Sequence, residues 1–518
     1  MKYLLAFGIA FSLLAADVSN LGKQWWQHIL FLADDKLEGR NAGSEGHRLA
    51  AEYVAAQFRS LGLKPVIQPV PFLTKQIDEP NSSLELIRDG KATKITLGKE
   101  AVLGMRCDPA ENVNAPMVFV GYGLKLDEKN YDDLKGLDLR GKIAVSLMGV
   151  GPSEITGPLR SHVQSALKWK ALRAAGAIGV ATIASAKSQD IPWARSSLAR
   201  FAVSMDLDEE ALRDNTGEQI SISINPEHAQ LFFDGSGHTL AELFAVAETG
   251  KPLPHFTMPV SVRAHMAVKR GKVVSQNVAA MVEGTDPKLK HEAVVLSAHL
   301  DHIGVGEPVN GDRINNGAMD NASGIAALIE VARGLKPSKR SVILAAVTGE
   351  EKGLLGSRYF AAHPAVKTDA MVADFNLDMF LPLHPLKLLS IQGLDESTLG
   401  ADIRAAAAEF DVKIMGDTEP QRNLFVRSDQ YSFIKKGIPA LAFKFGYEKG
   451  SPEETLHKDW LKNRYHAPSD DVNQPVDIAG AEKFLRILTH LVTRVANAQQ
   501  RPEWNDTSFF KRFATGSH

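Results

Sequence analysis

The stretch Ser341-Val342-Ile343-Leu344-Ala345-Ala346-Val347-Thr348-Gly349-Glu350-Glu351-Lys352-Gly353 places two adjacent carboxylates directly after an apolar run. The run 342–347 is β-rich and predicts a buried strand, and residues 354–362 predict the helix that follows. Neighbouring side chains on extended chain point to opposite sides, so Glu350 and Glu351 can serve different partners. An isolated pair of this kind fits a solvated charged turn, so its meaning depends on the residues around it.

Strands and helices alternate along the chain on both sides of this stretch. Expected strands cover 277–284, 292–298, 342–347, 370–377 and 439–445, and expected helices cover 324–335, 354–363, 399–410 and 479–498. This alternation predicts an α/β fold with a mixed, mostly parallel sheet covered by helices on both faces. In such sheets, binding and catalytic residues collect at the carboxyl ends of the strands.

Residues of metal-ligand type stand at or near the ends of these expected strands or in loops close to them. They are His299, Asp320, Glu351, Asp378 and His466. A mixed imidazole and carboxylate set suits Zn²⁺ better than Ca²⁺ or Mg²⁺, which prefer oxygen ligands. One catalytic zinc usually keeps three protein ligands, so five ligands with one bridging carboxylate serve two metals. The set therefore predicts two zinc ions per chain.

Asp301 stands two residues after His299, so the two side chains share a face if the chain is extended there. We expect its carboxylate to accept the proton on the second ring nitrogen of His299, which would fix the tautomer of the ligand.

Five segments resemble those of the co-catalytic zinc exopeptidases, a family that includes bacterial leucyl-type aminopeptidases, aminopeptidase Y and glutamate carboxypeptidase. They are AHLDH (298–302), GAMDNASG (317–324), TGEEKGLLGS (348–357), NLDM (376–379) and YHAPSDD (465–471). The resemblance covers about residues 275–497. The early loop 37–43 also resembles the N-terminal segment of the family, and a helix is expected after it, capped by Ser44 and ending near Gly62. Residues 117–265 resemble the protease-associated domain that some members carry as an insert.

The resemblance implies a role for each metal ligand. Asp320 would bridge both metals and would have a cis peptide bond to Asn321. His299 and Asp378 would complete one metal site. Glu351 and His466 would complete the other.

The resemblance also implies the catalytic groups. Glu350 would be the general base that takes a proton from the metal-bridging water and passes it to the leaving amine. Asp301 would support the ligand His299. Tyr465, next to a ligand, would either stabilise the carbonyl oxygen of the substrate as it becomes an oxyanion or serve in packing.

The chain departs from the family pattern at two positions. Gln430 follows Ser428-Asp429 where relatives often have histidine, and Phe425 stands where some members have a catalytic tyrosine. Neither position is a metal ligand, so we expect activity to survive, but the substrate pocket need not follow that of relatives.

Length and composition set the domain plan. A chain of 518 residues is too long for one compact domain by the usual prior. Residues 1–16 resemble a secretory signal, with Lys2 before an apolar run that is too short to span a bilayer. We expect a catalytic domain of residues 17–110 and 266–500, a β-rich protease-associated insert of residues 111–265, and a C-terminal tail of residues 501–518.

The signal predicts export, to the periplasm or outside the cell, with no membrane span after its removal. Cys107 is the only cysteine, so no disulfide can form within the chain. The formal net charge of −2 argues against a nucleic-acid partner. The oligomeric state is left open.

The leading functional prediction is an exported dinuclear zinc aminopeptidase that acts on peptides. A carboxypeptidase of the glutamate type is the nearest alternative, and it would need cations to hold the substrate carboxylate; the candidates are Arg422, Arg427, Lys444 and Arg464. A glutaminyl cyclase would need only one zinc. A receptor or binding module on the same fold would have lost metal ligands, and no ligand is lost in this sequence.

Overall fold

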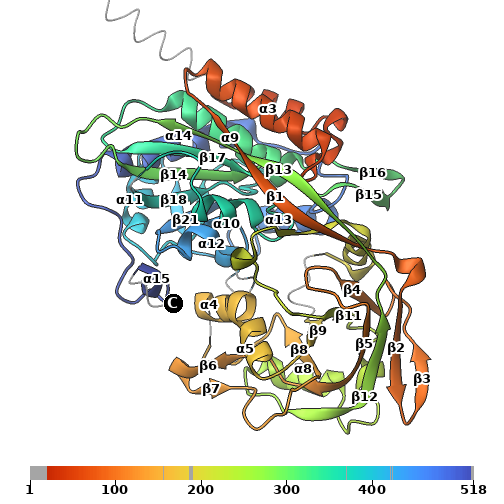
Figure 1. Ribbon diagram of the computed structural model, residues 1–518. Helices are drawn as coiled ribbons and strands as arrows, with labels where there is room; N and C mark the ends of the chain where they lie inside the picture. The colour runs from red at the N-terminus through yellow and green to blue at the C-terminus, as the bar shows by residue number, and fades with distance from the viewer. Residues whose placement is uncertain are drawn as a thin grey trace, which may run out of the picture. The chain divides into compact units, whose positions relative to one another are not determined.

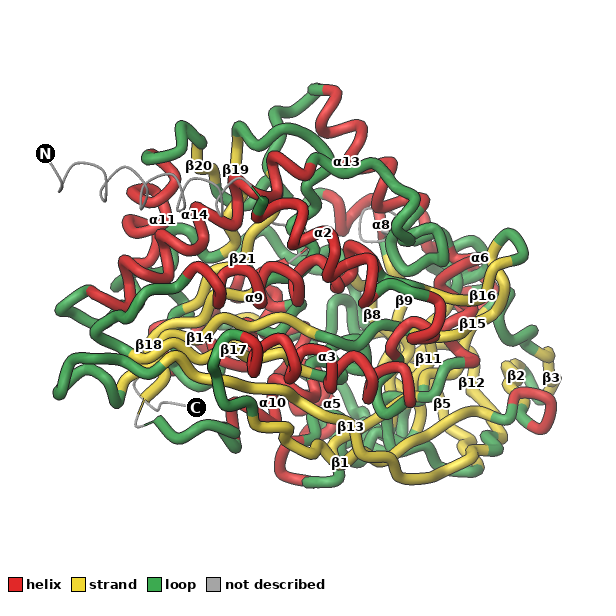
Figure 2. Tube along the Cα trace, turned by 90° about the horizontal axis from the view of Figure 1, so that it is seen from above, coloured by secondary structure: helices red, strands yellow, loops and turns green. Residues whose placement is uncertain are grey.

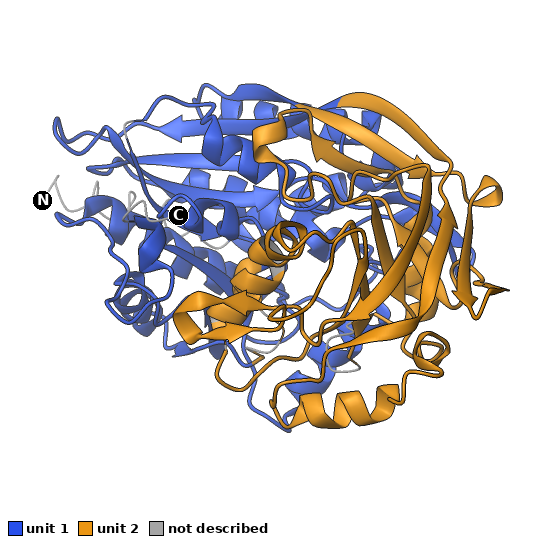
Figure 3. Ribbon diagram, turned by 60° about the horizontal axis from the view of Figure 1, so that its bottom comes forward, with its two compact units in different colours: residues 1–70, 274–418, 427–518 blue, residues 71–273, 419–426 orange. Residues whose placement is uncertain are grey.

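The computed structural model describes residues 20–155, 157–185, 191–368, 370–419, 422 and 424–514, so the predicted signal of residues 1–16 lies outside the described residues. The chain forms two compact units (Figure 3). Unit 1 comprises residues 1–70, 274–418 and 427–518, and unit 2 comprises residues 71–273 and 419–426. The predicted insert of residues 111–265 falls within unit 2, which begins earlier and ends later. Residues 501–514 belong to unit 1, where Phe510 is fully buried.

Unit 1 is built on a mixed sheet (Figure 1) with the strand order β1-β13-β17-β14-β18-β21-β19-β20. The strands are β1 (Val66–Ile77), β13 (Val268–Val282), β14 (Glu292–His299), β17 (Ser341–Val347), β18 (Ala370–Asn376), β19 (Leu388–Gln392), β20 (Lys413–Met415) and β21 (Ala440–Phe445). Strands β17, β14, β18 and β21 are parallel, whereas β13 and β19 run antiparallel to their neighbours β17 and β21. The predicted mixed, mostly parallel sheet is confirmed.

Helices cover both faces of this sheet. They are α2 (Leu21–Leu32), α3 (Glu45–Ser60), α9 (Ser323–Gly334), α10 (Leu355–Ala362), α11 (Leu399–Ala408), α12 (Gln430–Ile434), α13 (Pro452–Asn463) and α14 (Ile478–Asn497). Alternate residues of β17 belong to different cores, as the period of two in a strand requires. Leu344 packs in a core with α2, α3, α9, α11 and α14, whereas Ile343 packs in a second core with Phe360 of α10 and Phe433 of α12. Figure 2 shows α9 lying alongside β14 and β17.

The helix that follows the early loop begins and ends where the sequence predicts. The Ser44 side chain accepts a hydrogen bond from the backbone N–H of His47, which caps α3. Gly62, with φ +78°, follows the last turn in the left-handed region that glycine tolerates best. Both predicted ends of the helix are confirmed.

Unit 2 is rich in short strands. Its sheet has the order β3-β2-β12-β5-β8-β9-β11-β4. The strands of this sheet are β2 (Ser83–Arg88), β3 (Lys91–Lys94), β4 (Ala101–Gly104), β5 (Asn112–Phe119), β8 (Ile143–Met148), β9 (Gly179–Ala184), β11 (Ile220–Ile224) and β12 (Phe256–His265). The longest helices of the unit are α5 (Lys168–Ala174) and α8 (Leu240–Glu248). Within the part of the chain that the structure describes, no helix combines the length and apolar character needed to cross a membrane.

Candidate metal centre

The parallel strands β14, β17 and β18 bring their carboxyl ends to one edge of the sheet. His299, the last residue of β14, pairs in register with Val347, the last residue of β17, and Ser297 pairs with Asn376 at the end of β18. Each strand is buried on both faces, so the chain turns polar only where the strands end. Glu350 and Glu351 after β17, and Asp378 after β18, therefore reach the same edge as His299.

Asp320 comes to this edge on a short turn, η8 (Ala318–Ala322), that leads into α9. The carboxylate of Asp470 accepts hydrogen bonds from the backbone N–H groups of Met319 and Asp320, each at 2.9 Å. Gly317 precedes the turn with φ +63°, and a Cβ there would lie 2.1 Å from the carbonyl oxygen of Asp320. The turn therefore requires glycine at position 317.

Asn321 joins this turn to the loop that carries Asp378. Its Nδ2 donates to the carbonyl of Leu377 at 2.7 Å, and its Oδ1 accepts from the N–H of Gly324 at 3.0 Å. The peptide bond between Asp320 and Asn321 is cis, as the resemblance implied.

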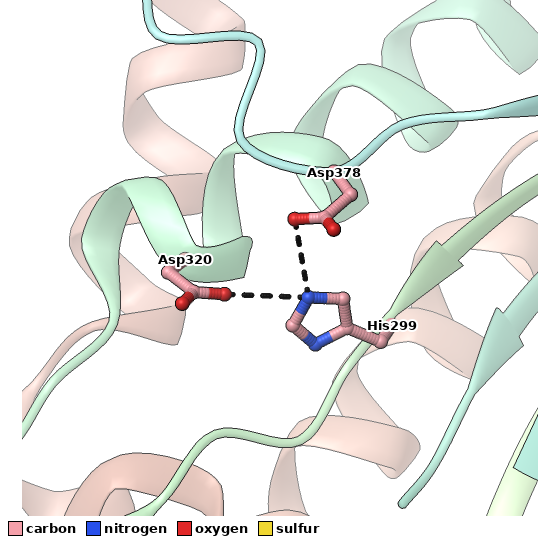
Figure 4. A group of neighbouring side chains, drawn as sticks. All are labelled: His299, Asp320 and Asp378. Carbon is pink, nitrogen blue, oxygen red and sulfur yellow. Dashed lines mark ion pairs between the residues drawn. The ribbon is translucent and has the colours of Figure 1, made fainter. Parts of the chain in front are cut away.

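One half of the centre contains His299, Asp320 and Asp378 (Figure 4). Their side chains point toward one another from β14, η8 and the loop after β18. Nε2 of His299 lies 3.3 Å from Oδ1 of Asp320 and 3.5 Å from Oδ1 of Asp378. The three donor atoms therefore face a common point.

The other half contains His466, Glu351 and the second oxygen of Asp320. Nε2 of His466 lies 3.3 Å from Oδ2 of Asp320 and 3.2 Å from Oε2 of Glu351. Asp320 thus presents one carboxylate oxygen to each half. The structure brings all five predicted ligands together.

His302 belongs to the same cluster, although sequence reasoning gave it no role. Its side chain is fully buried, and its Nδ1 lies 2.8 Å from Oε1 of Glu351 and 3.9 Å from Oδ2 of Asp320. The residue stands in the segment AHLDH, three positions after His299, so the motif contained the signal. Asn321 and Asp470 likewise lie in the segments 317–324 and 465–471, and the sequence assigned neither of them a role.

Asp301 makes a different contact from the one predicted. Nδ1 of His299 lies 3.0 Å from the backbone carbonyl oxygen of Asp301, not from its carboxylate. The carboxylate turns instead to the loop after β17, where Oδ1 accepts the N–H of Glu350 at 3.1 Å. Strand β14 ends at His299, so the extended geometry on which the prediction rested does not continue to Asp301. Asp301 still fixes the histidine ring, through its main chain.

The electrostatics of the centre favour bound positive charge. Burial by itself lowers the pKa of His466, but the carboxylates of Glu351 and Asp320 raise it to about 10. Burial likewise opposes protonation of His299, yet Asp320 and Asp378 raise its pKa well above the usual range. Buried carboxylates at this spacing need cations as partners, and imidazole and carboxylate donors form a set that zinc prefers. The donor set therefore fits zinc, and Asp320 offers one oxygen to each half of the centre.

Glu350 is buried near His299, Glu351 and Asp378, whose charges act on its carboxyl group. Burial raises the pKa of its carboxyl group well above the usual range; the charge of His299 lowers it, and Glu351 and Asp378 raise it further. A raised pKa is the property expected of a group that accepts and returns a proton during a reaction.

Tyr465 packs its ring on that of His466, with the ring centroids 4.0 Å apart. Burial raises the pKa of its hydroxyl well above the usual range, and Arg427 lowers it in part. The hydroxyl therefore keeps its proton and can donate a hydrogen bond.

Gln430, at the position where relatives often have histidine, is buried. Its Oε1 accepts a hydrogen bond from Nδ2 of Asn376 at 2.7 Å, two residues before the predicted ligand Asp378. Phe425 is also buried.

Lys444, Arg464 and Arg422, considered above for a substrate carboxylate, contact other groups of the protein. Nζ of Lys444 donates to the carbonyl of Asp378 at 2.8 Å, and Arg464 donates to the carbonyl of Ser469. Arg422 pairs with Glu419 at 2.8 Å within unit 2.

The sequence of the segment that carries the centre matches a known family. Residues 277–492 match the model of Peptidase family M28. Residues 277–492 are called the M28 segment. All five predicted metal ligands lie within the M28 segment, whereas the early loop and helices α2 and α3 precede it.

Two curated relatives of the M28 segment carry aminopeptidase names. The probable leucine aminopeptidase 2 of Aspergillus oryzae is 28% identical over 248 residues, which is 45% of each protein. Aminopeptidase YwaD of Bacillus subtilis is 29% identical over 206 residues, or 38% of this chain and 40% of the relative. The chain thus spans less than half of the length of these relatives.

The fold extends this likeness over nearly the whole chain. The solved structure of an aminopeptidase from Aneurinibacillus sp. strain AM-1 superimposes with a TM-score of 0.56 at 21% identity. The match covers 93% of this chain and 95% of the other. The M28 segment and the remainder of the chain therefore share the architecture of a solved aminopeptidase.

Proposed function

We propose that this protein is an exported, zinc-dependent aminopeptidase that removes N-terminal residues from peptides. The observation that carries the proposal is the geometry of Asp320, whose two oxygens each lie 3.3 Å from a different histidine, His299 and His466. The aminopeptidase names of the relatives support the reaction class. Export rests on Lys2 and the apolar run of residues 3–14.

Zinc ions held by these residues would supply Lewis acidity to the scissile carbonyl and acidify the attacking water. The chain's own groups divide the remaining work. The Glu350 carboxylate takes a proton from the attacking water as its oxygen bonds to the carbonyl carbon. Glu350 then gives this proton to the nitrogen of the leaving amine as the C–N bond breaks.

Other residues hold the reacting groups in position. The carboxylate of Asp301 accepts the backbone N–H of Glu350 and so fixes its loop, and the carbonyl of Asp301 fixes the ring of His299. The protonated hydroxyl of Tyr465 is placed beside His466 and would donate to the carbonyl oxygen of the substrate as negative charge develops there.

A matched pair of variants tests the division between the adjacent glutamates. Glu350→Gln should retain two zinc ions per chain and lose at least about 100-fold in kcat, because it keeps the shape of the side chain and removes the base. Glu351→Gln should bind one zinc less. Zinc per chain is measured by atomic emission, and kcat with aminoacyl amides. Wild-type turnover in Glu350→Gln, or equal zinc content in the two variants, would refute the mechanism.

The polarity of the enzyme needs a separate assay. Peptides blocked at the N-terminus should resist cleavage, whereas peptides blocked at the C-terminus should be shortened from the free amine. The opposite pattern would establish a carboxypeptidase, and release of pyroglutamate with one zinc per chain would establish a cyclase.

A further inference from the structure

The early loop contains a charged residue that the proposed reaction does not use. Arg40 follows Leu37-Glu38-Gly39, lies outside the M28 segment, and has no exposed surface. Glu38, Gly39 and Arg40 all have positive φ, at 47°, 64° and 51°. A Cβ on Gly39 would lie 2.2 Å from the carbonyl oxygen of Asn315. The loop adopts a strained conformation that turns a guanidinium into the interior of unit 1.

All four hydrogen-bond acceptors around this guanidinium are main-chain carbonyls. Nε donates to Leu300 at 3.0 Å, Nη1 donates to Asn316 at 2.6 Å and also to Leu32, and Nη2 donates to Gly317 at 3.0 Å. Leu300 directly follows the predicted ligand His299. Gly317 begins the turn that carries Asp320. The loops after His299 and before Asp320 are therefore linked to each other by the guanidinium of Arg40. The same group links both loops to the end of α2.

The contacts near Arg40 reinforce this connection. The N–H of His302 faces the carbonyl of Arg40 at 3.3 Å. Nδ2 of Asn316 donates to the carbonyl of Ala33 at 3.0 Å and to Asp35 at 2.7 Å. The segment of residues 33–40 thus holds both ligand loops through hydrogen bonds to their main chains and to Asn316.

The charge of Arg40 has carboxylates to balance it. Burial lowers the pKa of its guanidinium to about 10, while Asp470, Asp320, Asp301 and Glu351 raise it, so the group is cationic at neutral pH. A buried cation whose direct partners are neutral carbonyls is costly unless such charges lie nearby.

We propose that Arg40 is a positioning residue of the metal centre: it fixes the loops of His299 and Asp320 so that both ligands are in place before zinc binds. This inference rests on the proposed zinc centre. A lysine offers three donors on one atom and cannot bind four carbonyls in one plane, so Arg40→Lys keeps the charge and removes the fork.

Arg340 provides a matched control, because it is also a fully buried arginine bound to main-chain carbonyls in unit 1. Its donors reach Val495 at 3.3 Å, Ala498 at 2.5 Å and Gln499 at 3.3 Å, along with Glu292 at 2.7 Å. Arg340 precedes the first residue of β17, at the opposite end of the strand from Glu350. Arg340→Lys therefore reports what the loss of a buried fork does to stability alone.

The experiment titrates zinc chloride into the chelator-treated, full-length chain in competition with a chromophoric chelator. Arg340→Lys should lower the melting temperature of the zinc-free protein and leave zinc affinity within about twofold of wild type. Arg40→Lys should bind zinc about 10–100-fold more weakly, as changes around metal ligands typically do. Its kcat should recover when zinc is raised.

Zinc affinity of Arg40→Lys within about twofold of wild type would overturn the inference. If Arg40→Lys does not fold, Arg40→Gln replaces it, since glutamine keeps one N–H-bearing nitrogen and cannot reach all four carbonyls. Weaker zinc binding by Arg40→Gln supports the inference, and wild-type affinity rejects it. A wild-type chain that binds no zinc would reject the proposed function instead.

Discussion

Glu351 presents its two carboxylate oxygens to two different histidines. Oε2 lies 3.2 Å from His466, the partner that the resemblance implied, and Oε1 lies 2.8 Å from the buried His302. A proton on Nδ1 of His302 would hold Oε1 and leave Oε2 directed at the metal site. Partners of this kind orient ligands and adjust their affinity for the metal.

Substitutions at His302 test this role. His302→Leu removes the ring nitrogen that lies 2.8 Å from Oε1 of Glu351 and should weaken zinc binding by about 10–100-fold. His302→Asn retains an N–H near the position of Nδ1 and should stay within a few-fold of wild type. Zinc titration of the two variants checks the difference, and equal affinities would show that His302 only fills space.

Three predicted ligands follow apolar runs that end as strands β14, β17 and β18, whereas Asp320 lies in η8 and His466 follows helix α13, so those two depended on the resemblance of their segments. The contact of the Asp301 carboxylate could not be predicted, because it depends on where β14 stops and on the path of the loop after β17. The role of Arg40 was hidden for a similar reason: all four of its acceptors are main-chain atoms, which carry no sequence signal.

At the scale of elements, the turn η8 depends on the glycine that precedes it. Gly317 has φ +63° and no room for a Cβ. Gly311, in the nearby hairpin of β15 (Gly304–Val309) and β16 (Asp312–Asn315), has φ +90° with nothing within 4 Å of the added atom. The two glycines share a backbone conformation and differ in the space around them.

Substitution of each glycine by alanine separates the cost of a left-handed backbone from the cost of a steric clash of the added Cβ. Gly311→Ala should cost about 1–2 kcal/mol of stability, the cost of left-handed backbone, and leave zinc binding unchanged. Gly317→Ala should also displace Asp320 and reduce zinc content toward zero. Thermal unfolding and zinc analysis provide the two measurements. Full zinc occupancy in Gly317→Ala would show that the turn can move without losing its ligand.

Most elements of unit 1 were visible in the sequence, because burial on one or two faces gives a clear apolar period. The predicted helix 479–498 differs from α14 (Ile478–Asn497) by one residue at each end. Strand β13 begins at Val268, nine residues before the predicted strand 277–284. Its first part, which includes Lys269, Arg270 and Lys272, is largely exposed and has no apolar pattern.

At the scale of the whole molecule, removal of zinc should affect one unit. Bound zinc stabilises the folded state by about 4 kcal/mol per site at a free concentration 1,000 times Kd. Because the predicted ligands all belong to unit 1, a chelator should raise amide hydrogen exchange around residues 299–302, 317–322, 349–352 and 465–470.

Strands β8 and β9 of unit 2 serve as the internal control for this measurement, and their exchange should not change. Added zinc should restore protection in unit 1, and added magnesium should not. Unchanged exchange at residues 317–322 after complete zinc removal would contradict a centre that depends on metal for local stability.

The long-range contacts of α2 have a consequence for folding while the chain is being synthesised on the ribosome. Nε1 of Trp25 donates to the carbonyl of Ser323, and His28 lies 2.9 Å from Glu330. The partners of both residues are therefore synthesised about 300 positions later. At about 5–20 residues per second, this delay lasts roughly 15–60 s. Nearly all of unit 2 is synthesised within that interval. The apolar faces of α2 and α3 lack their partners in α9 during this interval, so we expect this segment to need a chaperone during translation.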